Sequence, residues 1–147
     1  MRLEDKLAIQ EVVAQYSYAY DTTDAEGFAA LFTEDAVWEL FAAGATQPEV
    51  RLESRAAIRE WAAQRLHRRI RRFSSRHYQS GMLFDTLTAE AAWTRTMVLI
   101  THQGISEATP RPVLSGVYYD QWRKTPEGWR LAHRILRHDG NAPYVSE

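Results

Sequence analysis

The 147-residue sequence contains no cysteine. Disulfide bonds, thiolate nucleophiles and cysteine-based metal sites are therefore excluded together. An excess of one charge is also missing, because eighteen Lys and Arg residues stand against nineteen Asp and Glu residues. The overall charge therefore predicts neither a nucleic-acid partner nor a membrane partner. Since no apolar run has the length of a signal sequence or a membrane span, we expect a cytoplasmic protein.

Motifs for nucleotide, metal and hydrolase chemistry are absent as well. The sequence has no glycine-rich phosphate loop, no GxSxG and no dinucleotide-binding fingerprint. It also has no HExxH and no HxH, so we predict no bound metal. The expectation is a protein that works without a cofactor.

Apolar and aromatic residues are plentiful instead. Hydrophobic residues make up 45% of the chain and aromatic residues 12%, with five Trp and seven Tyr. A chain of this length can bury a real core and falls in the usual range for one domain. No repeat, low-complexity tract or linker divides it. We therefore predict a single domain over residues 1–147.

Helical patterns fill much of the first half. Residues 4–20 carry an apolar face at spacings of three and four, formed by Ile9, Val13, Tyr16 and Tyr20. Asp24 is placed to cap a short second helix that carries Phe28, Leu31 and Phe32. Ser54 is placed to cap a third helix, whose apolar stripe is Ile58, Trp61, Ala62 and Leu66.

Strand-like segments follow. After a first run at 36–42 and a loop at 44–48, segments rich in β-branched and aromatic residues cover 77–85, 91–103, 113–124 and 129–137. The sequence TPEG at 125–128 predicts a hairpin turn between the last two. Helices followed by antiparallel strands indicate an α+β fold with one curved sheet and helices on a single face.

Polar groups on these apolar faces are the candidate site residues. Tyr16 and Tyr20 each bring a hydroxyl into an apolar region, where it needs a hydrogen-bond partner. Either hydroxyl can bond to the backbone or reach the rim of the fold. Alternatively, one of them polarises a ligand carbonyl.

Among the five histidines, His77 and His102 are the candidates for a functional role, because each lies on a predicted strand where side chains alternate between core and solvent. His102 shares a strand face with four other residues, Thr94, Thr96, Val98 and Ile100. A histidine in a pocket wall can act as a general acid or base near neutral pH, although a structural role is the ordinary one. Asp21, at the end of the first helix, is either a connector or a carboxylate that holds one histidine ring in one tautomer.

A run of arginines extends from Arg65 to Arg76. Cations near the end of a helix are favourable, and a solvated face or a subunit contact explains the run. Nucleic-acid binding would require a basic domain around it, which this chain lacks.

Three segments resemble the SnoaL-like branch of the NTF2-like superfamily. They are YAYDTTDAEGFAALFTEDAVWEL, SSRHYQSGMLFD and SGVYYDQWRKTPEGWRLAHRIL, in this order. The resemblance implies an NTF2-like cone, in which about three helices pack on the concave face of a curved, antiparallel or mixed sheet. It also implies a pocket between the helices and the sheet.

Within that superfamily the site pattern is most similar to scytalone dehydratase. The resemblance assigns Tyr20, Asp21, His77 and His102 to catalysis and places Tyr118 near a pocket asparagine of that enzyme. A second catalytic tyrosine of that enzyme is missing, since Leu40 or Phe41 stands near its place. Ketosteroid isomerase, on the same fold, has a tyrosine that aligns with Tyr16, but no carboxylate stands where its base would be.

These patterns together predict a cofactor-free lyase, a dehydratase acting on an apolar cyclic or aromatic small molecule. Tyr20 would polarise a carbonyl, and His77 and His102 would transfer protons. Asp21 would orient one of the two histidine rings, and the pair considered in detail is Asp21 with His102. Strand alternation and helical spacing predict that Tyr16, Trp38 and Leu40 line the pocket and bind the substrate, and the resemblance adds Tyr118 to this set. A ligand-binding or assembly module, such as a ring-hydroxylating oxygenase small subunit, and an isomerase or polyketide cyclase are the alternatives. We also expect a homo-oligomer, a dimer or a trimer.

Overall fold

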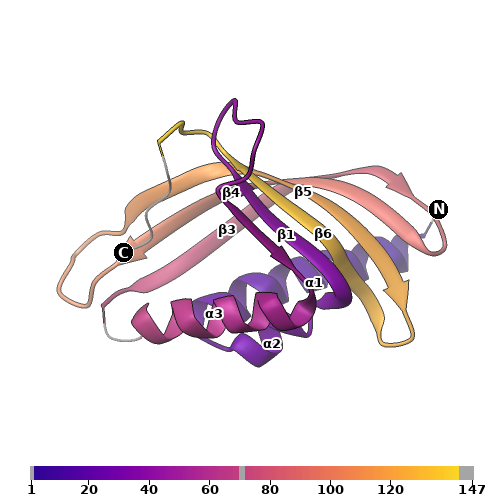
Figure 1. Cartoon of the computed structure of the whole chain (residues 1–147), viewed down its shortest axis with the longest axis horizontal. Coiled ribbons are helices and arrows are strands. Elements are labelled where there is room, and N and C mark those ends of the chain that lie inside the picture. The colour runs from indigo at the N-terminus through magenta and orange to yellow at the C-terminus, as the bar shows by residue number, and fades with distance from the viewer. Residues whose placement is uncertain (1, 70–71, 143–147) are drawn as a thin grey trace.

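The computed structural model describes residues 2–69 and 72–142. Figure 1 shows the elements in these ranges. In chain order they are α1 (Leu3–Asp21), α2 (Ala25–Ala29), β1 (Phe32–Phe41), β2 (Val50–Glu53), α3 (Arg55–Arg69), β3 (Ser74–Leu87), β4 (Ala91–Gln103), β5 (Arg111–Thr125) and β6 (Gly128–His138).

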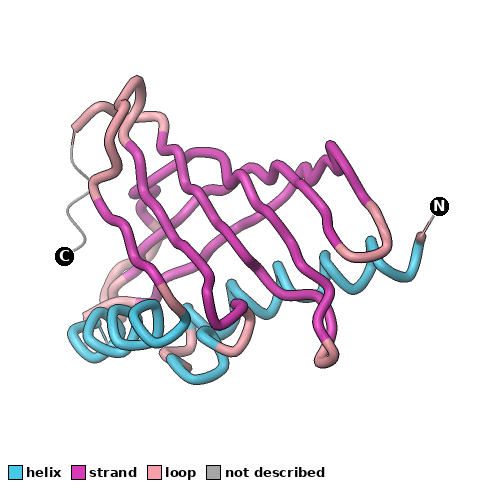
Figure 2. The backbone as a smooth tube through the Cα atoms, turned by 45° about the vertical axis from the view of Figure 1, so that its right-hand side comes forward, coloured by secondary structure: helices cyan, strands magenta, loops and turns pink. Residues whose placement is uncertain are grey.

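The strands form one mixed sheet with the order β2-β1-β6-β5-β4-β3. β1 and β6 run parallel, and the other neighbouring strands run antiparallel. The helices lie against one face of this sheet, and the sheet curves around them (Figure 2). The predicted fold class, an α+β cone with helices on the concave face of a curved mixed sheet, is confirmed.

Breaks in strand register accompany the curvature. The β3–β4 pairing shifts between Ser80 and Leu83, where Gly81 has a φ of +66°, and the β5–β6 pairing shifts between Gln121 and Trp122. A bulge of this kind bends the strand that carries it and increases its twist. These bends allow long strands to wrap around α1 and leave space beneath them.

The helices pack as their sequence patterns predict. All four residues of the predicted α1 stripe are buried, and so are Ile58, Ala62 and Leu66 of α3. The Asp24 carboxylate accepts a hydrogen bond from the Gly27 amide, and the Ser54 hydroxyl accepts one from the Ala57 amide. Both predicted N-caps are therefore confirmed. None of the described helices combines the length and the apolar content needed to cross a membrane.

Two boundaries differ from the sequence-based expectation. The second helix ends at Ala29, and Phe32, expected within it, begins β1 and pairs with Leu131. The Leu131 amide also donates to the Leu31 carbonyl at 2.9 Å, so parallel pairing with β6 satisfies backbone groups that another helical turn would have used. The short strand β2, which was not predicted, pairs with β1 along its whole length.

The convex face of the sheet carries exposed apolar side chains. Along β4 the residues alternate as far as Ile100, with Thr94, Thr96, Val98 and Ile100 buried, and Thr101 and His102 are both buried after it. Their neighbours on the convex face include large exposed side chains, and the neighbouring strands contribute more of them. We call this set the outer apolar patch: Tyr78, Trp93, Met97, Leu99 and Tyr119.

Candidate active site

A cavity lies between the helices and the concave face of the sheet. The empty space within it, with the open solvent at its mouth included, is about 490 Å³. Six of the eight predicted site residues are in its wall: Tyr16, Tyr20, Trp38, Leu40, His77 and Tyr118. The other described residues of the wall are Val50, Trp61, Arg65, Ile100, Leu114 and Leu136. Two helices and all six strands contribute to it, so the cavity is a product of the whole fold.

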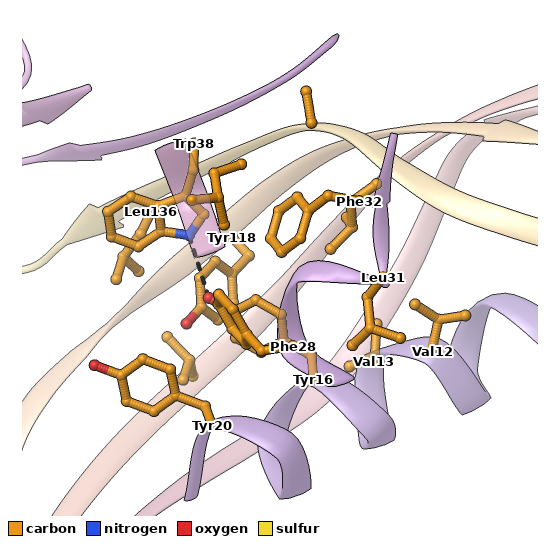
Figure 3. Close-up of a cluster of buried hydrophobic side chains, with 14 of the residues drawn as sticks. Val12, Val13, Tyr16, Tyr20, Phe28, Leu31, Phe32, Trp38, Tyr118 and Leu136 are labelled. Atoms are coloured by element: carbon orange, nitrogen blue, oxygen red, sulfur yellow. Dashed lines mark hydrogen bonds between the residues drawn. The ribbon is translucent and has the colours of Figure 1, made fainter. Parts of the chain in front are cut away.

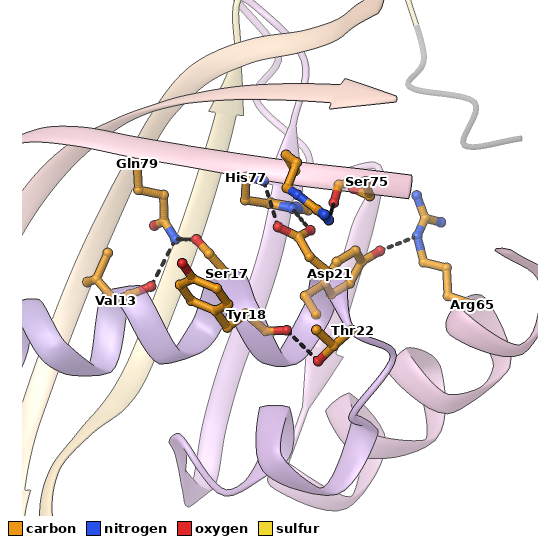
Figure 4. Close-up of polar contacts among 11 residues, drawn as sticks. Val13, Ser17, Tyr18, Asp21, Thr22, Arg65, Ser75, His77 and Gln79 are labelled. Carbon is orange, nitrogen blue, oxygen red and sulfur yellow. Dashed lines mark hydrogen bonds and ion pairs between the residues drawn. The ribbon is translucent and has the colours of Figure 1, made fainter. Parts of the chain in front are cut away.

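Asp21 holds His77 through both of its carboxylate oxygens. Oδ1 lies 2.7 Å from Nδ1 of the His77 ring, and Oδ2 accepts a hydrogen bond of 2.9 Å from the His77 backbone amide (Figure 4). The two side chains are only 7% and 6% exposed. A carboxylate at Nδ1 favours the tautomer with the proton on that nitrogen, which leaves the lone pair on Nε2. The pair therefore presents a histidine prepared to accept a proton.

The position of Asp21 explains why this pair forms. Asp21 is the last residue of α1, where the helix dipole disfavours a negative charge. β3 is the edge strand beside this helix end, so the His77 amide is directed away from the sheet and toward the carboxylate. Two N–H donors from one residue compensate the unfavourable position. The helix end and the sheet edge thus fix the ring.

Tyr20 connects His77 to Arg65. Its ring meets the His77 ring at a centroid distance of 4.8 Å and an angle of 66°. Its hydroxyl accepts a hydrogen bond of 3.1 Å from Nε of Arg65, which comes from α3 (Figure 4). The tyrosine that the sequence predicts to polarise a carbonyl is therefore next to His77 and also next to a guanidinium.

Tyr16 and Tyr118 form a second group of hydroxyls in the wall. Nε1 of Trp38 donates to the Tyr16 hydroxyl at 3.2 Å, and the Tyr16 and Tyr118 rings meet edge to face at 5.8 Å (Figure 3). Burial raises the pKa of the Tyr16 hydroxyl and raises the pKa of the Tyr118 hydroxyl well above its ordinary value. Both side chains are therefore protonated at neutral pH and keep an O–H that can donate.

A fully buried arginine supports these two tyrosines. The guanidinium of Arg134 lies 4.2 Å from the Tyr16 ring centroid and 3.6 Å from that of Tyr118. It donates to both oxygens of Asp120 at 2.8 and 3.0 Å and to the Gln79 side chain at 2.9 Å. Burial raises the pKa of the Asp120 carboxyl, and the charge of Arg134 opposes that rise. The pair with Asp120 holds the Arg134 guanidinium in place, and the rings of Tyr16 and Tyr118 pack against that guanidinium.

The sequence-based prediction did not include Arg134, Asp120 or Arg65. Helical spacing gave a signal for Arg65, which follows Trp61 by four residues and Ile58 by seven and so continues the apolar stripe. The predicted hairpin turn brings Asp120 close to Arg134, and the shift between Gln121 and Trp122 brings them directly opposite each other. The paired charges become evident only with that bulge.

His102 has a different environment from His77. It is buried at 5% exposure, pairs across the sheet with Ser75, and stacks on Phe73 at a ring distance of 4.0 Å and an angle of 22°. It is not among the described residues that line the cavity. The histidine that Asp21 binds is His77, whereas the pair considered from the sequence was Asp21 with His102. Which histidine Asp21 binds depends on where the end of α1 meets β3. Local sequence patterns do not contain that information.

The described residues include no group of three or more His, Asp or Glu side chains arranged to hold a metal ion. The part of the arginine run at residues 70–71 lies outside the described residues. The site as described therefore consists of a histidine–carboxylate pair, three tyrosines, one arginine and apolar walls.

Comparisons with known proteins agree with this architecture. The family model for the SnoaL-like domain matches residues 1–135. No curated protein matches the chain significantly. Among solved structures, a variant of Rv3472, a protein of unknown function from Mycobacterium tuberculosis, is 30% identical, with 94% of this chain and 73% of that chain covered and a TM-score of 0.77.

Two structures from Novosphingobium aromaticivorans are also similar. One, named as a candidate scytalone dehydratase, is 26% identical, with 99% of this chain and 91% of that chain covered and a TM-score of 0.78. The other, named as the beta subunit of a candidate aromatic-ring-hydroxylating dioxygenase, is 16% identical, with 99% and 94% covered and a TM-score of 0.79. At that identity the second similarity shows the fold alone.

Proposed function

Because the chain belongs to the SnoaL-like domain family, we propose that it is a cofactor-free lyase that removes water from a cyclic or aromatic small molecule. The reaction would take place in the cavity that Tyr20 and His77 line. One observation carries the proposal: a buried histidine, bound at Nδ1 by a buried carboxylate, lies in the wall of a cavity that is lined mainly by apolar and aromatic side chains.

His77 performs the proton transfers in this mechanism. Its Nε2 takes the proton from a C–H next to a substrate carbonyl, and the electron pair of that bond moves into an enolate. The imidazolium, stabilised by Asp21, then returns the proton to the departing hydroxyl, which leaves as water. One histidine therefore serves both as base and as acid, and the proton balance closes without a second group.

The tyrosine hydroxyls stabilise the negative charge that develops on the carbonyl oxygen. Tyr20 is next to the base, and Tyr16 and Tyr118 remain protonated because burial raises the pKa of each hydroxyl. Preorganised donors directed at the carbonyl oxygen stabilise an oxyanion more than water would. Since Trp38 donates to Tyr16, the proton of that hydroxyl is directed elsewhere.

This mechanism uses His77 alone, whereas the mechanism expected from the sequence used His77 and His102 together. Stacked on Phe73 and outside the described cavity wall, His102 is assigned a packing role. The similarity to a protein named as a candidate scytalone dehydratase supports the lyase assignment over other chemistry on this fold.

A ligand-binding or assembly module is the second proposal. The exposed aromatic and aliphatic side chains of the outer apolar patch, which include Trp93, Met97 and Leu99, favour it. A third use of the site, isomerisation or cyclisation, would employ the same base without loss of water.

Product mass distinguishes these functions. The protein would be incubated with a panel of cyclic compounds that carry a hydroxyl group one carbon away from the carbon next to a carbonyl. We expect a product lighter by the mass of one water, formed by the wild type and not by His77→Ala. A product of unchanged mass would identify an isomerase or cyclase. Binding without turnover, retained by His77→Ala, would identify a binding module.

A further inference from the structure

Arg65 occupies an unusual place for an arginine. It lies in the wall of the apolar cavity and not on the solvated face of α3. Nε donates to the Tyr20 hydroxyl at 3.1 Å, and the guanidinium lies 4.9 Å from the ring centroid of Trp61. The side chain is therefore oriented by two aromatic residues that themselves line the cavity.

The charge distribution around the cavity favours an anion. Of the described residues in the wall, Arg65 is the one with a permanent charge, and none is a carboxylate. Inside a largely apolar cavity a cation attracts an anionic group more strongly than it does in water.

We infer that the ligand of this cavity is a planar cyclic molecule that carries a carboxylate, and that Arg65 selects it through that acid. The inference deepens the proposed function and rests on it only in placing the substrate in the same cavity. A guanidinium forms a planar fork of donors that matches a carboxylate, which a tyrosine hydroxyl does not. The aromatic walls formed by Trp38 and Trp61 suit a flat ring.

The geometry also sets where the acid lies relative to the reacting carbon. The Tyr20 ring packs on His77, and its hydroxyl reaches Arg65, so the base and the guanidinium are one tyrosine apart. A carboxylate held by Arg65 therefore places a carbon about one ring away within reach of His77. Arg65 thus acts as a specificity-determining residue, and the proton transfer remains with His77.

Two probes of the same shape test this inference without a known substrate. Isothermal titration calorimetry would compare 2-naphthoate, which carries the acid, with 2-naphthamide, which is neutral. We expect the wild type to bind the acid roughly tenfold or more tightly than the amide, the scale of a hydrogen bond to a charged group. Arg65→Met should abolish that preference, because the guanidinium that distinguishes the acid from the amide is gone while the methionine preserves the aliphatic packing.

Matched variants control for charge and for folding. Arg59→Met removes an exposed arginine of the same helix, one that pairs with Glu26, and should leave the preference intact. Arg65→Gln, which also removes the charge but keeps a polar group near Tyr20, should lose the preference as Arg65→Met does. If circular dichroism shows that Arg65→Met is unfolded, Arg65→Gln tests in its place whether the charge of Arg65 selects the acid. Equal binding of both probes by the wild type, or a preference kept by both Arg65 variants, would overturn the inference.

The outcome is separable from the proposed function. His77→Ala should retain the preference for the acid, because binding of the carboxylate does not involve the base. A preserved preference in a protein that never turns over any substrate would sustain Arg65 as the acid-selecting residue and remove the lyase. Turnover of neutral compounds by a wild type that shows no preference for the acid would do the opposite.

Discussion

Asp21 satisfies two donors of a single residue, the ring Nδ1 and the backbone amide of His77. A carboxylate accepts both, whereas an asparagine has one acceptor and a donor that would face the other N–H. The identity of this side chain therefore decides both the tautomer and the orientation of the ring.

Asp21→Asn is accordingly expected to reduce turnover severely, by roughly a hundredfold or more, with a smaller change in KM. Steady-state kinetics on the substrate found by product mass would measure this. Asp24→Asn is the matched control, because Asp24 is a helix cap at which asparagine serves equally well. Equal activity of Asp21→Asn and Asp24→Asn would show that the carboxylate of Asp21 has no catalytic importance.

The predictable part of the site follows from local spacing. Tyr16 and Tyr20 are four residues apart on one helix face, and Trp38 and Leu40 are two apart on one strand face, so the sequence was sufficient to place these four side chains in the cavity wall. The partner of Asp21 was not predictable in this way. It depends on which residue of the edge strand β3 lies next to the end of α1, and the packing of the whole fold determines that position.

At the level of secondary structure, the β5–β6 hairpin carries the buried pair of Asp120 and Arg134. An arginine cannot lose its proton, whereas a buried carboxyl can gain one. The two halves of the pair should therefore respond differently to removal of the partner.

We expect Asp120→Asn to lower the free energy of unfolding by roughly 3–5 kcal/mol at neutral pH, because it leaves a buried cation without its counterion. Arg134→Met should cost a similar amount there but recover as the pH is lowered. Burial already raises the pKa of the Asp120 carboxyl, and without Arg134 that pKa rises further. The folded variant then binds a proton that the unfolded chain releases, so its stability increases as the pH falls toward about 4.

Urea unfolding of both variants and the wild type at two pH values measures this difference. Because other groups also titrate, each variant is compared with the wild type at the same pH. A deficit of Arg134→Met that is identical at both pH values would contradict the assignment of a raised pKa to Asp120.

A separate polar contact joins α1 to the β5–β6 hairpin. The Asp5 carboxylate accepts hydrogen bonds from Lys124 and from the Trp129 indole, both at 2.8 Å, and these two bonds lower its pKa. A lowered pKa in the folded state adds stability above the ordinary aspartate pKa of about 3.9. That stability is lost as the pH falls through the folded-state pKa.

Asp5→Asn should therefore be less stable than the wild type at neutral pH, and the difference should shrink as the pH falls below about 4. Denaturant unfolding followed by tryptophan fluorescence across this range would measure it. Glu4→Gln, a change at the exposed neighbour, is the control. A stability difference between Asp5→Asn and wild type that does not depend on pH would exclude the contribution of this carboxylate.

Strand alternation predicted the elements unevenly. The segment 91–103 was predicted to the residue because its buried and exposed side chains alternate from Ala92 to Ile100. β2 was missed because it has only four residues, two of them charged. Phe32, the first residue of β1, was taken as helix because Phe28, Leu31 and Phe32 also fit a helical face. In both cases pairing with a strand distant in sequence decides the structure, and a local pattern cannot contain that information.

For the whole molecule, the outer apolar patch leads us to keep the expectation of a dimer or trimer. Tyr78, Met97 and Leu99 are each more than 40% exposed and lie on neighbouring strands. A contiguous apolar surface of this kind on a small domain marks an interaction site. A second copy of the chain is the occupant we expect, and it would leave the concave cavity accessible.

Light scattering at micromolar concentration should return a multiple of the 17.0 kDa chain mass. Met97→Glu combined with Leu99→Lys should reduce it to a single chain while binding of 2-naphthoate persists. Tyr18→Ser, a change at an exposed tyrosine of α1 outside the patch, should leave the mass unchanged. A mass near 17.0 kDa for the wild type would refute the oligomer.

The central claim is that one histidine, His77, performs the proton transfers in this protein. Its most direct test compares the turnover of His77→Ala with that of His102→Ala on the same substrate, at matched folding stability. We predict a loss of roughly a hundredfold or more for His77→Ala, the scale of a general acid–base group. His102→Ala should remain close to the wild type, because its ring packs on Phe73 outside the described cavity wall. Equal and large losses in both variants would restore the histidine pair, and wild-type turnover in both would contradict acid–base catalysis by histidine altogether.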